Sequence, residues 1–475
     1  MCIRKHSDMR FLLAIISVLC LQICVHSQDD YCFGKDTERP QTRHFTSKTA
    51  YQIIKGTNME KEYLVPGCKA TKIWILHRHG TRLPTVSTIK AAPRLEILRD
   101  EIVKNYRVRR TKPDTNALCL EDLTLLSMWK WNASITIDQE QFLTAQGYED
   151  LKGTAKTYQR LYGDVLNKNY NNSHYKFRHT DTQRTTESFK AFVEGLFGVN
   201  NTVQPDPIPE EDLLLRPYDY CESWKAHDYS GINSESYKFK HSAVWNKTIE
   251  EISKRLGFQY PLESSDVELM WDMCRYEQAW QVDRISAWCA VLTSEQVTIL
   301  EYEDDMKYYY KLGYGYEENT RLNCRAAQDM LTHLNSETTP NVVAYFAHTS
   351  GVQTLLAALG IAKDNTPLTA ANYNRSDYKW RTSNLDPFAS NFIAVKYECN
   401  DNMPDKAIFF LNQNAVEFDW CDGSLCDWPE VLKQYQLLYT ADCSNFYCAG
   451  ASAVSIVTSL SLLLFCTSII LRLMY

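Results

Sequence analysis

The chain contains no basic tract, no Cys-x-x-Cys pair, no internal repeat and no linker rich in proline or glycine. Nucleic-acid binders neutralise phosphates with clustered lysine and arginine. The lack of a basic tract and the net charge of −7 therefore argue against a nucleic-acid partner. The lack of a Cys-x-x-Cys pair argues against a zinc ribbon, and the sequence shows no other cluster of metal-ligating residues. With 44% hydrophobic residues, the composition excludes disorder, collagen and coiled coil as descriptions of the whole chain.

Residues 1–27 have the pattern of a cleaved secretory signal peptide. Basic residues precede an uncharged, mostly apolar run from Phe11 to Val25, which is short for a membrane span. The small residues Val25 and Ser27 stand before a cleavage site at Gln28. The pattern therefore predicts entry into the secretory pathway and an ectodomain of residues 28–448.

Residues 449–475 form a hydrophobic tail. The stretch from 449 to 471 carries no charge and is long enough to cross a bilayer. Its small and hydroxyl residues favour a removed signal for a GPI anchor, with attachment among Asp442 to Ser444. A transmembrane helix with Arg472 on the cytoplasmic side is the alternative. Both predict a membrane-tethered protein on the extracellular face of the plasma membrane, and the endoplasmic reticulum lumen is the alternative location.

Cysteine usage agrees with export. Four of the 16 cysteines lie in the two end segments, which leaves twelve in residues 28–448. An even number in an exported chain predicts disulfides, and their pairing stays open, although Cys421 and Cys426 are close enough in sequence to form a small loop. The N-x-S/T sequons, which suit a glycosylated ectodomain, begin at Asn132, Asn171, Asn200, Asn246 and Asn374.

Two short apolar runs each lead into a histidine. The runs Ile73–Leu76 and Val342–Ala347 are typical of parallel strands covered on both faces, and they precede His79 and His348. An apolar stripe between Phe189 and Phe197 predicts a helix that opens near Asp181 or Thr182 and carries Arg184 in its first turn. Two adjacent strands are predicted at Phe392–Tyr397 and Ala407–Leu411.

These elements predict an α/β fold, in which an open sheet is flanked by helices. The α/β core is assigned to about residues 45–90, 165–204 and 325–440. Residues of about 91–164 and 205–324 are richer in helical pattern, tryptophan and tyrosine, so they are assigned to an inserted, mostly α-helical cap.

The heptapeptide Arg78-His79-Gly80-Thr81-Arg82-Leu83-Pro84 follows the first strand, where open α/β sheets place ligand crevices. Arginine forks match phosphate oxygens, and Gly80 lets a ligand approach the backbone closely. Because protonation would add like charge between Arg78 and Arg82, we expect the pKa of His79 to be lowered. A neutral imidazole is a nucleophile, and its attack on phosphorus would give a phosphohistidine.

This heptapeptide resembles the signature R-H-G-x-R-x-P of the histidine acid phosphatases, branch 2 of the histidine phosphatases. The family also has a helix reading R-T-x-x-S-x-x-x-F, which Arg184 to Phe192 matches, and a second histidine after a late strand, which His348 matches. The resemblance implies a histidine-phosphatase-like sheet, His79 as nucleophile, and Arg78, Arg82, Arg184 and His348 as groups that bind the phosphoryl group. It implies no metal ion and no other cofactor.

Within the family, the chain is most similar to the members that act on inositol polyphosphates. The resemblance therefore implies a small polyphosphorylated substrate, such as phytate or InsP5, and extends to 2,3-bisphosphoglycerate. Basic residues near the heptapeptide are candidates for holding further phosphates, and these are Lys90, Arg94, Arg109, Arg110 and Lys112. The oligomeric state stays open.

The segment His348-Thr349-Ser350 departs from the family, which has an acid after the second histidine, as His-Asp or His-Ala-Glu. That acid protonates the leaving alkoxide, and such catalysis contributes roughly a hundred- to ten-thousand-fold. Three explanations stay open: Glu187 or Asp181 supplies the proton, a neighbouring phosphate of the substrate supplies it, or turnover is slow. The departure leaves two rival functions, a general acid phosphatase of the same fold and a cell-surface pseudophosphatase that binds phosphorylated ligands.

Overall fold

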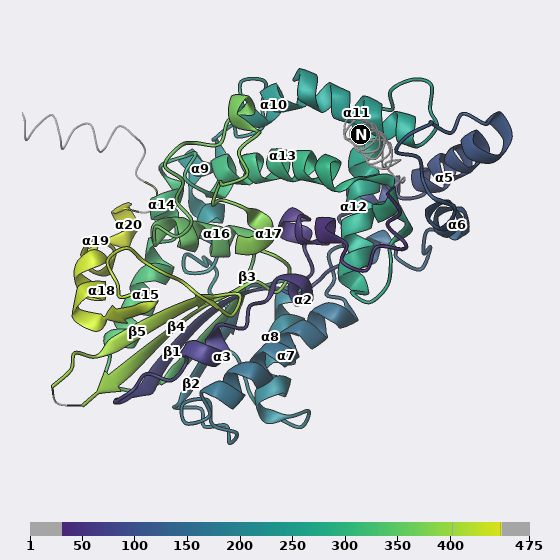
Figure 1. Ribbon diagram of the computed structural model, residues 1–475. Helices are drawn as coiled ribbons and strands as arrows, with labels where there is room; N and C mark the ends of the chain where they lie inside the picture. The colour runs from purple at the N-terminus through teal and green to yellow at the C-terminus, as the bar shows by residue number, and fades with distance from the viewer. Residues whose placement is uncertain (1–30, 401, 447, 449–475) are drawn as a thin grey trace, which may run out of the picture.

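The computed structural model describes residues 31–400, 402–446 and 448 (Figure 1). The predicted signal peptide, residues 1–27, and the hydrophobic tail, residues 449–475, lie outside the described residues. Among the helices of the described part, none combines the length and the hydrophobicity that spanning a bilayer requires.

A seven-stranded sheet with the order β2-β3-β1-β4-β5-β6, and with β7 paired to β5, forms the centre of the α/β part. β1, β2 and β3 are parallel, whereas β4 runs antiparallel to β1 and β5 antiparallel to β4. The strands are β1 (Cys68–Arg78), β2 (Tyr175–His179), β3 (Val342–Ala347), β4 (Asn391–Cys399), β5 (Lys406–Leu411), β6 (Asn414–Ala415) and β7 (Leu425–Asp427). The predicted α/β fold is confirmed, and the four predicted strands lie within β1, β3, β4 and β5.

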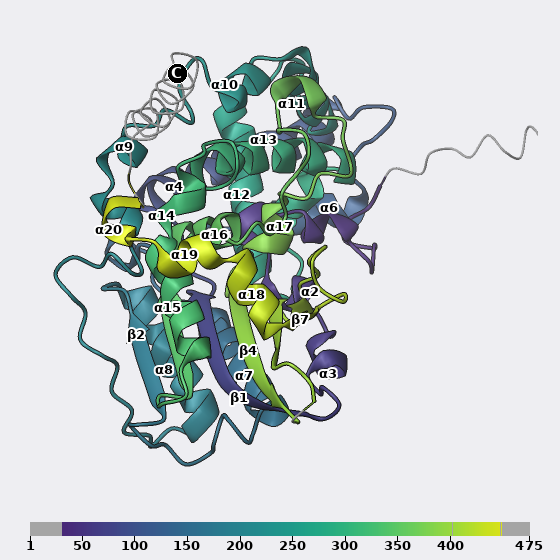
Figure 2. The same cartoon turned by 90° about the vertical axis from the view of Figure 1, so that its left-hand side faces the viewer.

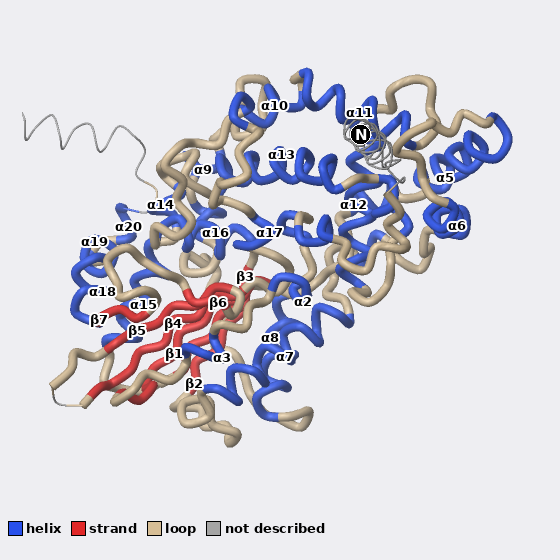
Figure 3. Tube along the Cα trace, in the orientation of Figure 1, coloured by secondary structure: helices blue, strands red, loops and turns tan. Residues whose placement is uncertain are grey.

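Helices and the loops between them make up the rest of the described chain (Figure 3). The α-helices are α2 (Tyr51–Ile54), α3 (Met59–Glu62), α4 (Val86–Ala91), α5 (Arg94–Lys104), α6 (Leu120–Met128), α7 (Ala145–Leu161), α8 (Gln183–Phe197), α9 (Glu222–Lys225), α10 (Glu235–Lys240), α11 (Ala243–Arg255), α12 (Ser264–Trp280), α13 (Ser294–Leu312), α14 (Asn319–Leu322), α15 (Cys324–Asn335), α16 (Thr349–Ala358), α17 (Thr382–Leu385), α18 (Trp428–Gln434), α19 (Gln436–Thr440) and α20 (Cys443–Phe446). Short 3₁₀ segments are η1 (Pro40–Arg43), η2 (Thr46–Lys48), η4 (Ile137–Gln139), η5 (Pro217–Tyr220), η6 (Ala287–Val291) and η7 (Ala370–Asn372), and η3 (Asn105–Arg109) is a π-helix.

The run Ile73–Leu76 of strand β1 is apolar without interruption because both faces of the sheet are covered there. Ile73 and Ile75 pack with α7 and α8 on one face, whereas Trp74 and Leu76 pack with α15 and α16 on the other. Figure 2 shows α15 on the opposite side of the sheet from α7 and α8. Successive side chains of a strand point to opposite faces, which explains how one run of four apolar residues serves two cores.

Helices α5, α6 and α10 to α13 gather beyond the ends of the strands, in the upper part of Figure 1. They come from the two ranges that the sequence assigns to a cap. Helix α7 belongs to the first of these ranges but packs against α8 and the sheet. Its buried stripe of Leu151, Ala155 and Tyr158 has the spacing that any helix against a core shows, so periodicity alone does not reveal which core it joins.

Six disulfides join all twelve cysteines of residues 31–448, in agreement with the prediction of disulfides. The pairs are Cys32–Cys119, Cys68–Cys399, Cys221–Cys448, Cys274–Cys289, Cys324–Cys443 and Cys421–Cys426. The predicted small loop is among them. The asparagines of all five sequons are exposed, as glycosylation requires, and their modification stays a prediction.

The loop after β1 touches the start of α7 backbone to backbone. A Cβ placed on Gly80 would lie 2.4 Å from the Gly147 carbonyl oxygen, and one on Gly147 would lie 2.3 Å from the Thr81 carbonyl oxygen. The Thr144 amide donates to the same Thr81 oxygen at 2.9 Å. Glycine at both positions therefore lets α7 support the loop directly.

We expect Gly147→Ala to lower the free energy of unfolding by about 1–3 kcal/mol, because the added methyl group overpacks this contact. The matched control is Gly153→Ala on the same helix, where an added Cβ would meet nothing within 4 Å. Alanine is the better helix former, so this control should raise the stability by about 0.5–1 kcal/mol. Denaturant unfolding of the disulfide-intact protein measures both, and equal stabilities would contradict the contact.

Candidate active site

The carboxyl ends of β1 and β3 bring the two candidate histidines together. The strands are parallel with Arg78 paired to Ala347, so the residues that follow them emerge at the same edge of the sheet. The His79 amide donates to the Ala347 carbonyl at 3.1 Å, and the rings of His79 and His348 lie 5.7 Å apart between centroids. The structure therefore brings His79 and His348 together, as the sequence predicts.

Helix α8 brings Arg184 to the same place. It follows β2, which pairs with β3, and it begins as predicted, because Thr182 caps it by accepting from the Thr185 amide. Arg184 lies in the first turn, with Nη2 3.2 Å from Nδ1 of His348. Ser188, one turn later, accepts from the Gly80 amide at 3.1 Å. The serine of the helix motif thus ties α8 to the loop that carries His79.

The hydrogen bond of His79 selects its tautomer. Nδ1 lies 2.9 Å from the Gly80 carbonyl oxygen, which can only accept, so Nδ1 carries the proton and Nε2 keeps its lone pair. Burial, and then the charges of Arg78 and Arg184, hold the pKa of His79 well below its usual value. His79 is therefore a neutral imidazole with one available nitrogen, which is the form a nucleophile needs.

His348 is held neutral in a similar way. The Arg184 guanidinium can only donate, so Nδ1 of His348 accepts, and Nε2 carries the proton and donates to Thr180 Oγ1 at 2.9 Å. Burial, followed by the charges of Arg184 and Arg216, keeps the pKa of His348 well below its usual value. A protonated Nε2 makes this imidazole a hydrogen-bond donor.

Backbone carbonyls fix Arg78 at the end of β1. Its buried guanidinium donates through Nη1 to the carbonyl oxygens of Ser47 at 2.5 Å and Asp386 at 2.7 Å, and it stacks 4.9 Å from the centre of the Phe388 ring. Burial lowers the pKa of Arg78, an effect that the Asp386 carboxylate opposes. Two uncharged acceptors therefore position this arginine.

Arg82 reaches across to the helical part. Its Nη1 donates to the Leu83 carbonyl at 2.9 Å and to the phenol oxygen of Tyr276 on α12 at 3.2 Å. Trp280, one turn further along α12, donates to the Arg82 carbonyl at 3.0 Å. The helical part thus helps to hold the second arginine of the signature.

Arg216 joins the cluster as a fourth guanidinium that no sequence motif indicates. Its charge lowers the pKa of His348 and of Arg184, which falls to about 10 mainly through burial. Arg216 lies just before η5 and pairs with Asp219 at 2.6 Å. It belongs to no motif, so only the folded arrangement places it beside the site.

The two candidate proton donors lie on or before α8. Glu187 is partly buried and pairs with Lys190 at 2.8 Å, and Asp181 is exposed in the loop before the helix. Among the described contacts, neither carboxyl touches His79 or His348. A role for either in proton transfer stays a prediction.

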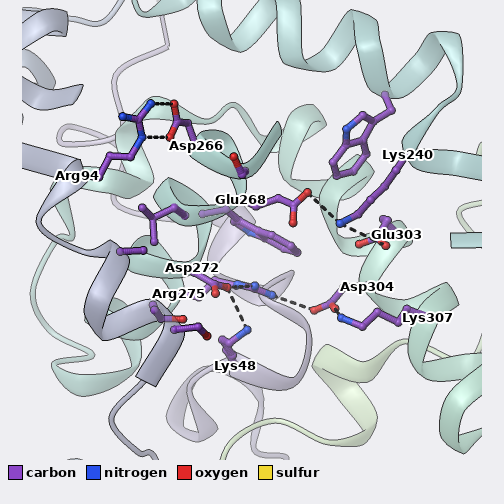
Figure 4. Close-up of a pocket in the computed structure, with 17 residues that line it drawn as sticks. Lys48, Arg94, Lys240, Asp266, Glu268, Asp272, Arg275, Glu303, Asp304 and Lys307 are labelled. Carbon is purple, nitrogen blue, oxygen red and sulfur yellow. Dashed lines mark hydrogen bonds and ion pairs between the residues drawn. The ribbon is translucent and has the colours of Figure 1, made fainter. Parts of the chain in front are cut away.

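A cavity of about 580 Å³ lies beside the site, between α4, α12 and α13 (Figure 4). It is lined by cations that are paired with carboxylates, among them Lys48 with Asp272 at 3.0 Å, Arg275 with Asp304 at 3.1 Å, Lys240 with Glu268 at 2.9 Å, and Arg94 with Asp266. Lys48 Nζ lies 5.5 Å from the centre of the Tyr276 ring, and the Arg82 guanidinium lies 5.9 Å from the same centre. The cavity therefore adjoins the arginine cluster.

The predicted further phosphate ligands are distributed unevenly. Arg94 lines the cavity, whereas Arg109 pairs with Glu101 at 2.8 Å on the surface. Lys90, Arg110 and Lys112 are exposed. Lys48, Lys240, Arg275 and Lys307 line the cavity as well, although no sequence pattern relates them to the heptapeptide.

Known proteins resemble the chain over most of its length. The family model of the histidine phosphatase superfamily (branch 2) matches residues 71–411. Multiple inositol polyphosphate phosphatase 1 of Drosophila melanogaster is 57% identical over 444 residues, 93% of this chain and 95% of that protein.

Solved structures show a similar fold. The phytase from D. castellii superposes with a TM-score of 0.69 at 17% identity and covers 87% of this chain and 90% of that one. The multiple inositol polyphosphate phosphatase of Bifidobacterium longum, in complex with inositol hexasulfate, superposes with a TM-score of 0.60 at 14% identity and covers 86% of this chain and 99% of that one.

We expect Arg216→Gln to weaken competitive inhibition by inorganic phosphate about three- to tenfold, because roughly 1 kcal/mol of Coulomb attraction is lost. Stability should change little, since the ion pair with Asp219 is partly exposed. Lys190→Gln, which removes the same charge from the exposed side of α8, is the control and should leave inhibition unchanged. Equal inhibition constants for wild type and Arg216→Gln would remove Arg216 from the anion site.

Proposed function

The chain belongs to branch 2 of the histidine phosphatase superfamily, and we propose that it hydrolyses inositol polyphosphates, such as phytate and InsP5, through a phosphohistidine on His79. Family membership and the identity to a curated phosphatase make it a phosphoric monoester hydrolase. The Drosophila relative supports the inositol polyphosphate substrate by its name, and the B. longum protein does so by its bound inositol hexasulfate. We extend the proposal to 2,3-bisphosphoglycerate, which is also a small polyphosphorylated ester.

One observation supports the chemistry most strongly: a neutral His79 with a free Nε2 lies inside a cluster of guanidiniums. The cluster would hold the phosphate oxygens of a bound ester while Nε2 attacks phosphorus and the alcohol oxygen leaves. Water would then attack the phosphohistidine and release inorganic phosphate. In this proposal Arg78, Arg82, Arg184 and His348 bind and stabilise the transferring phosphoryl group.

The adjoining cavity supports a substrate with several phosphates. The cations of the cavity are paired with carboxylates, so a further phosphate would have to replace these carboxylates as their partner. The negative net charge of the chain would not attract the phosphate, so these local cations would have to bind it. Lys48 and Arg275 are the cavity residues nearest in sequence to groups that hold Arg78 and Arg82. We assign the phosphates that are not being transferred to this cavity.

The disulfides support a place in the secretory pathway. Six disulfides persist only in an oxidising compartment, and all five sequons are exposed there for glycosylation. We propose the cell surface as the destination and the endoplasmic reticulum lumen as its alternative.

Release of inorganic phosphate from phytate and from p-nitrophenyl phosphate by the purified glycosylated protein tests the function. We expect release from both substrates, and His79→Ala should lower it by at least about a thousandfold because the nucleophile is gone. Hydrolysis of the aryl ester alone would indicate a general acid phosphatase, and phytate binding without turnover a pseudophosphatase. Persistent hydrolysis by His79→Ala would contradict the assigned nucleophile.

A further inference from the structure

A buried carboxyl group lies behind Arg78, on the segment between α17 and β4. Asp386 is fully buried, and its Oδ2 accepts from Gln353 Nε2 at 3.0 Å. The same Oδ2 lies 3.7 Å from Arg78 Nη1, beyond hydrogen-bond distance, and Oδ1 makes no hydrogen bond of ordinary length. The backbone carbonyl of Asp386, and not its carboxylate, is what binds Arg78. The carboxyl group is therefore not needed to position that arginine.

Helix α16 connects this carboxyl group to the phosphate site. Thr349 and Gln353 are four residues apart and share one face of the helix, and both interact with the Asp386 carboxyl group. Thr349 directly follows His348, and it is only partly buried, whereas Asp386 is inaccessible. The Thr349 hydroxyl therefore adjoins the buried acid and belongs to the residue that directly follows a histidine of the candidate site.

The surroundings of Asp386 favour its protonated form. Burial raises the pKa of this carboxyl group to about 6, although Arg78 from β1 and the Gln353 and Thr349 side chains from α16 oppose the shift. At mildly acidic pH, Asp386 therefore carries a proton that an exposed aspartate would have lost. A buried acid of this pKa beside an active site is the kind of group that general acid catalysis uses.

We propose that Asp386 is the proton source for the leaving alcohol and that the Thr349 hydroxyl relays the proton. As the bond between phosphorus and the ester oxygen breaks, the leaving alkoxide takes the proton of the Thr349 hydroxyl, and Thr349 takes the proton of the Asp386 carboxyl group. When water later attacks the phosphohistidine, a proton of that water returns through Thr349 to the Asp386 carboxylate. Protons and charge balance over the two steps, and Asp386 acts through Thr349 as a positioning residue.

The relay offers a physical answer to the missing acid after His348. Thr349 has the position at which the His-Asp members carry their acid, one residue before the position of the glutamate in the His-Ala-Glu members. A hydroxyl alone is too weak an acid for this task, but one supplied by a carboxyl group passes on that group's proton. The inference rests on the proposed phosphomonoester hydrolysis, but it holds for any alkyl phosphate.

The test compares an alkyl ester, glycerol 2-phosphate, with an aryl ester, p-nitrophenyl phosphate, whose leaving group needs no proton. For Asp386→Asn we expect kcat on the alkyl ester to fall about a hundredfold or more, and kcat on the aryl ester to fall less than about threefold. Equal losses on both esters would overturn the relay, because they would show that Asp386 only supports the fold. No loss on either ester would overturn it as well.

Variants of Thr349 test the relay without touching the buried carboxyl group. Thr349→Val removes the hydroxyl at nearly constant shape and should show the same selective loss as Asp386→Asn, whereas Thr349→Ser should restore alkyl hydrolysis. Similar activity of the Val and Ser variants would contradict the relay. Inorganic phosphate should raise the melting temperature of each variant, which verifies that the anion site is folded.

The pH profile gives a further readout. A carboxyl group with a pKa of about 6 is protonated below that pH and deprotonated above it. Wild-type kcat on the alkyl ester should therefore fall as the pH rises through about 6. The aryl ester and Asp386→Asn should lack this limb. If kcat of Asp386→Asn still falls through this pH range, the fall arises from the titration of another group, and the assignment to Asp386 is wrong. Hydrolysis of both test esters by a wild type that leaves phytate intact would refute the proposed substrate and not the relay.

Discussion

Placing several guanidiniums around two uncharged imidazoles is the constraint on which the rest of the site depends. Like charges repel, so arginines that are held together without being neutralised need uncharged anchors, which Arg78, Arg82 and Arg184 have, whereas Arg216 is paired with Asp219. Carbonyl oxygens accept hydrogen bonds from Arg78, and a carbonyl and a phenol oxygen accept from Arg82. An imidazole nitrogen accepts from Arg184. The cluster thereby stays positive in a chain of net charge −7, and a phosphate dianion is the partner that relieves its repulsion.

Both parts of the molecule maintain this arrangement. The sheet supplies the converging strand ends, and α12 and α13 supply contacts from the helical side. Asp305 on α13 accepts from the Thr382 amide and from the Tyr378 phenol, each at 2.9 Å, and so fixes the start of α17. That helix leads directly to Asp386, whose carbonyl holds Arg78. A buried network in the helical part thus determines where an arginine of the sheet points.

Local patterns predicted the elements that carry the chemistry. The apolar runs before His79 and His348 predicted β1 and β3, and the stripe behind Arg184 predicted α8, because both sheet faces and a helix core demand such sequences. Arg216 and Asp386 could not be predicted, since nothing in their neighbourhoods distinguishes them from surface residues and only tertiary contacts give them a role. The same limit applies to the long-range disulfides and to the packing of α7.

The position of β1 has a consequence for biosynthesis. Its two neighbours, β3 and β4, come from residues 342–399, so the central strand stays without a partner until most of the chain has been synthesised. Cys68 must wait equally long for Cys399, which lies 331 residues further along the chain, while Cys119 passes it first. The growing polypeptide therefore depends on folding helpers and on thiol exchange, which keep an apolar strand and an unpaired thiol from premature partners.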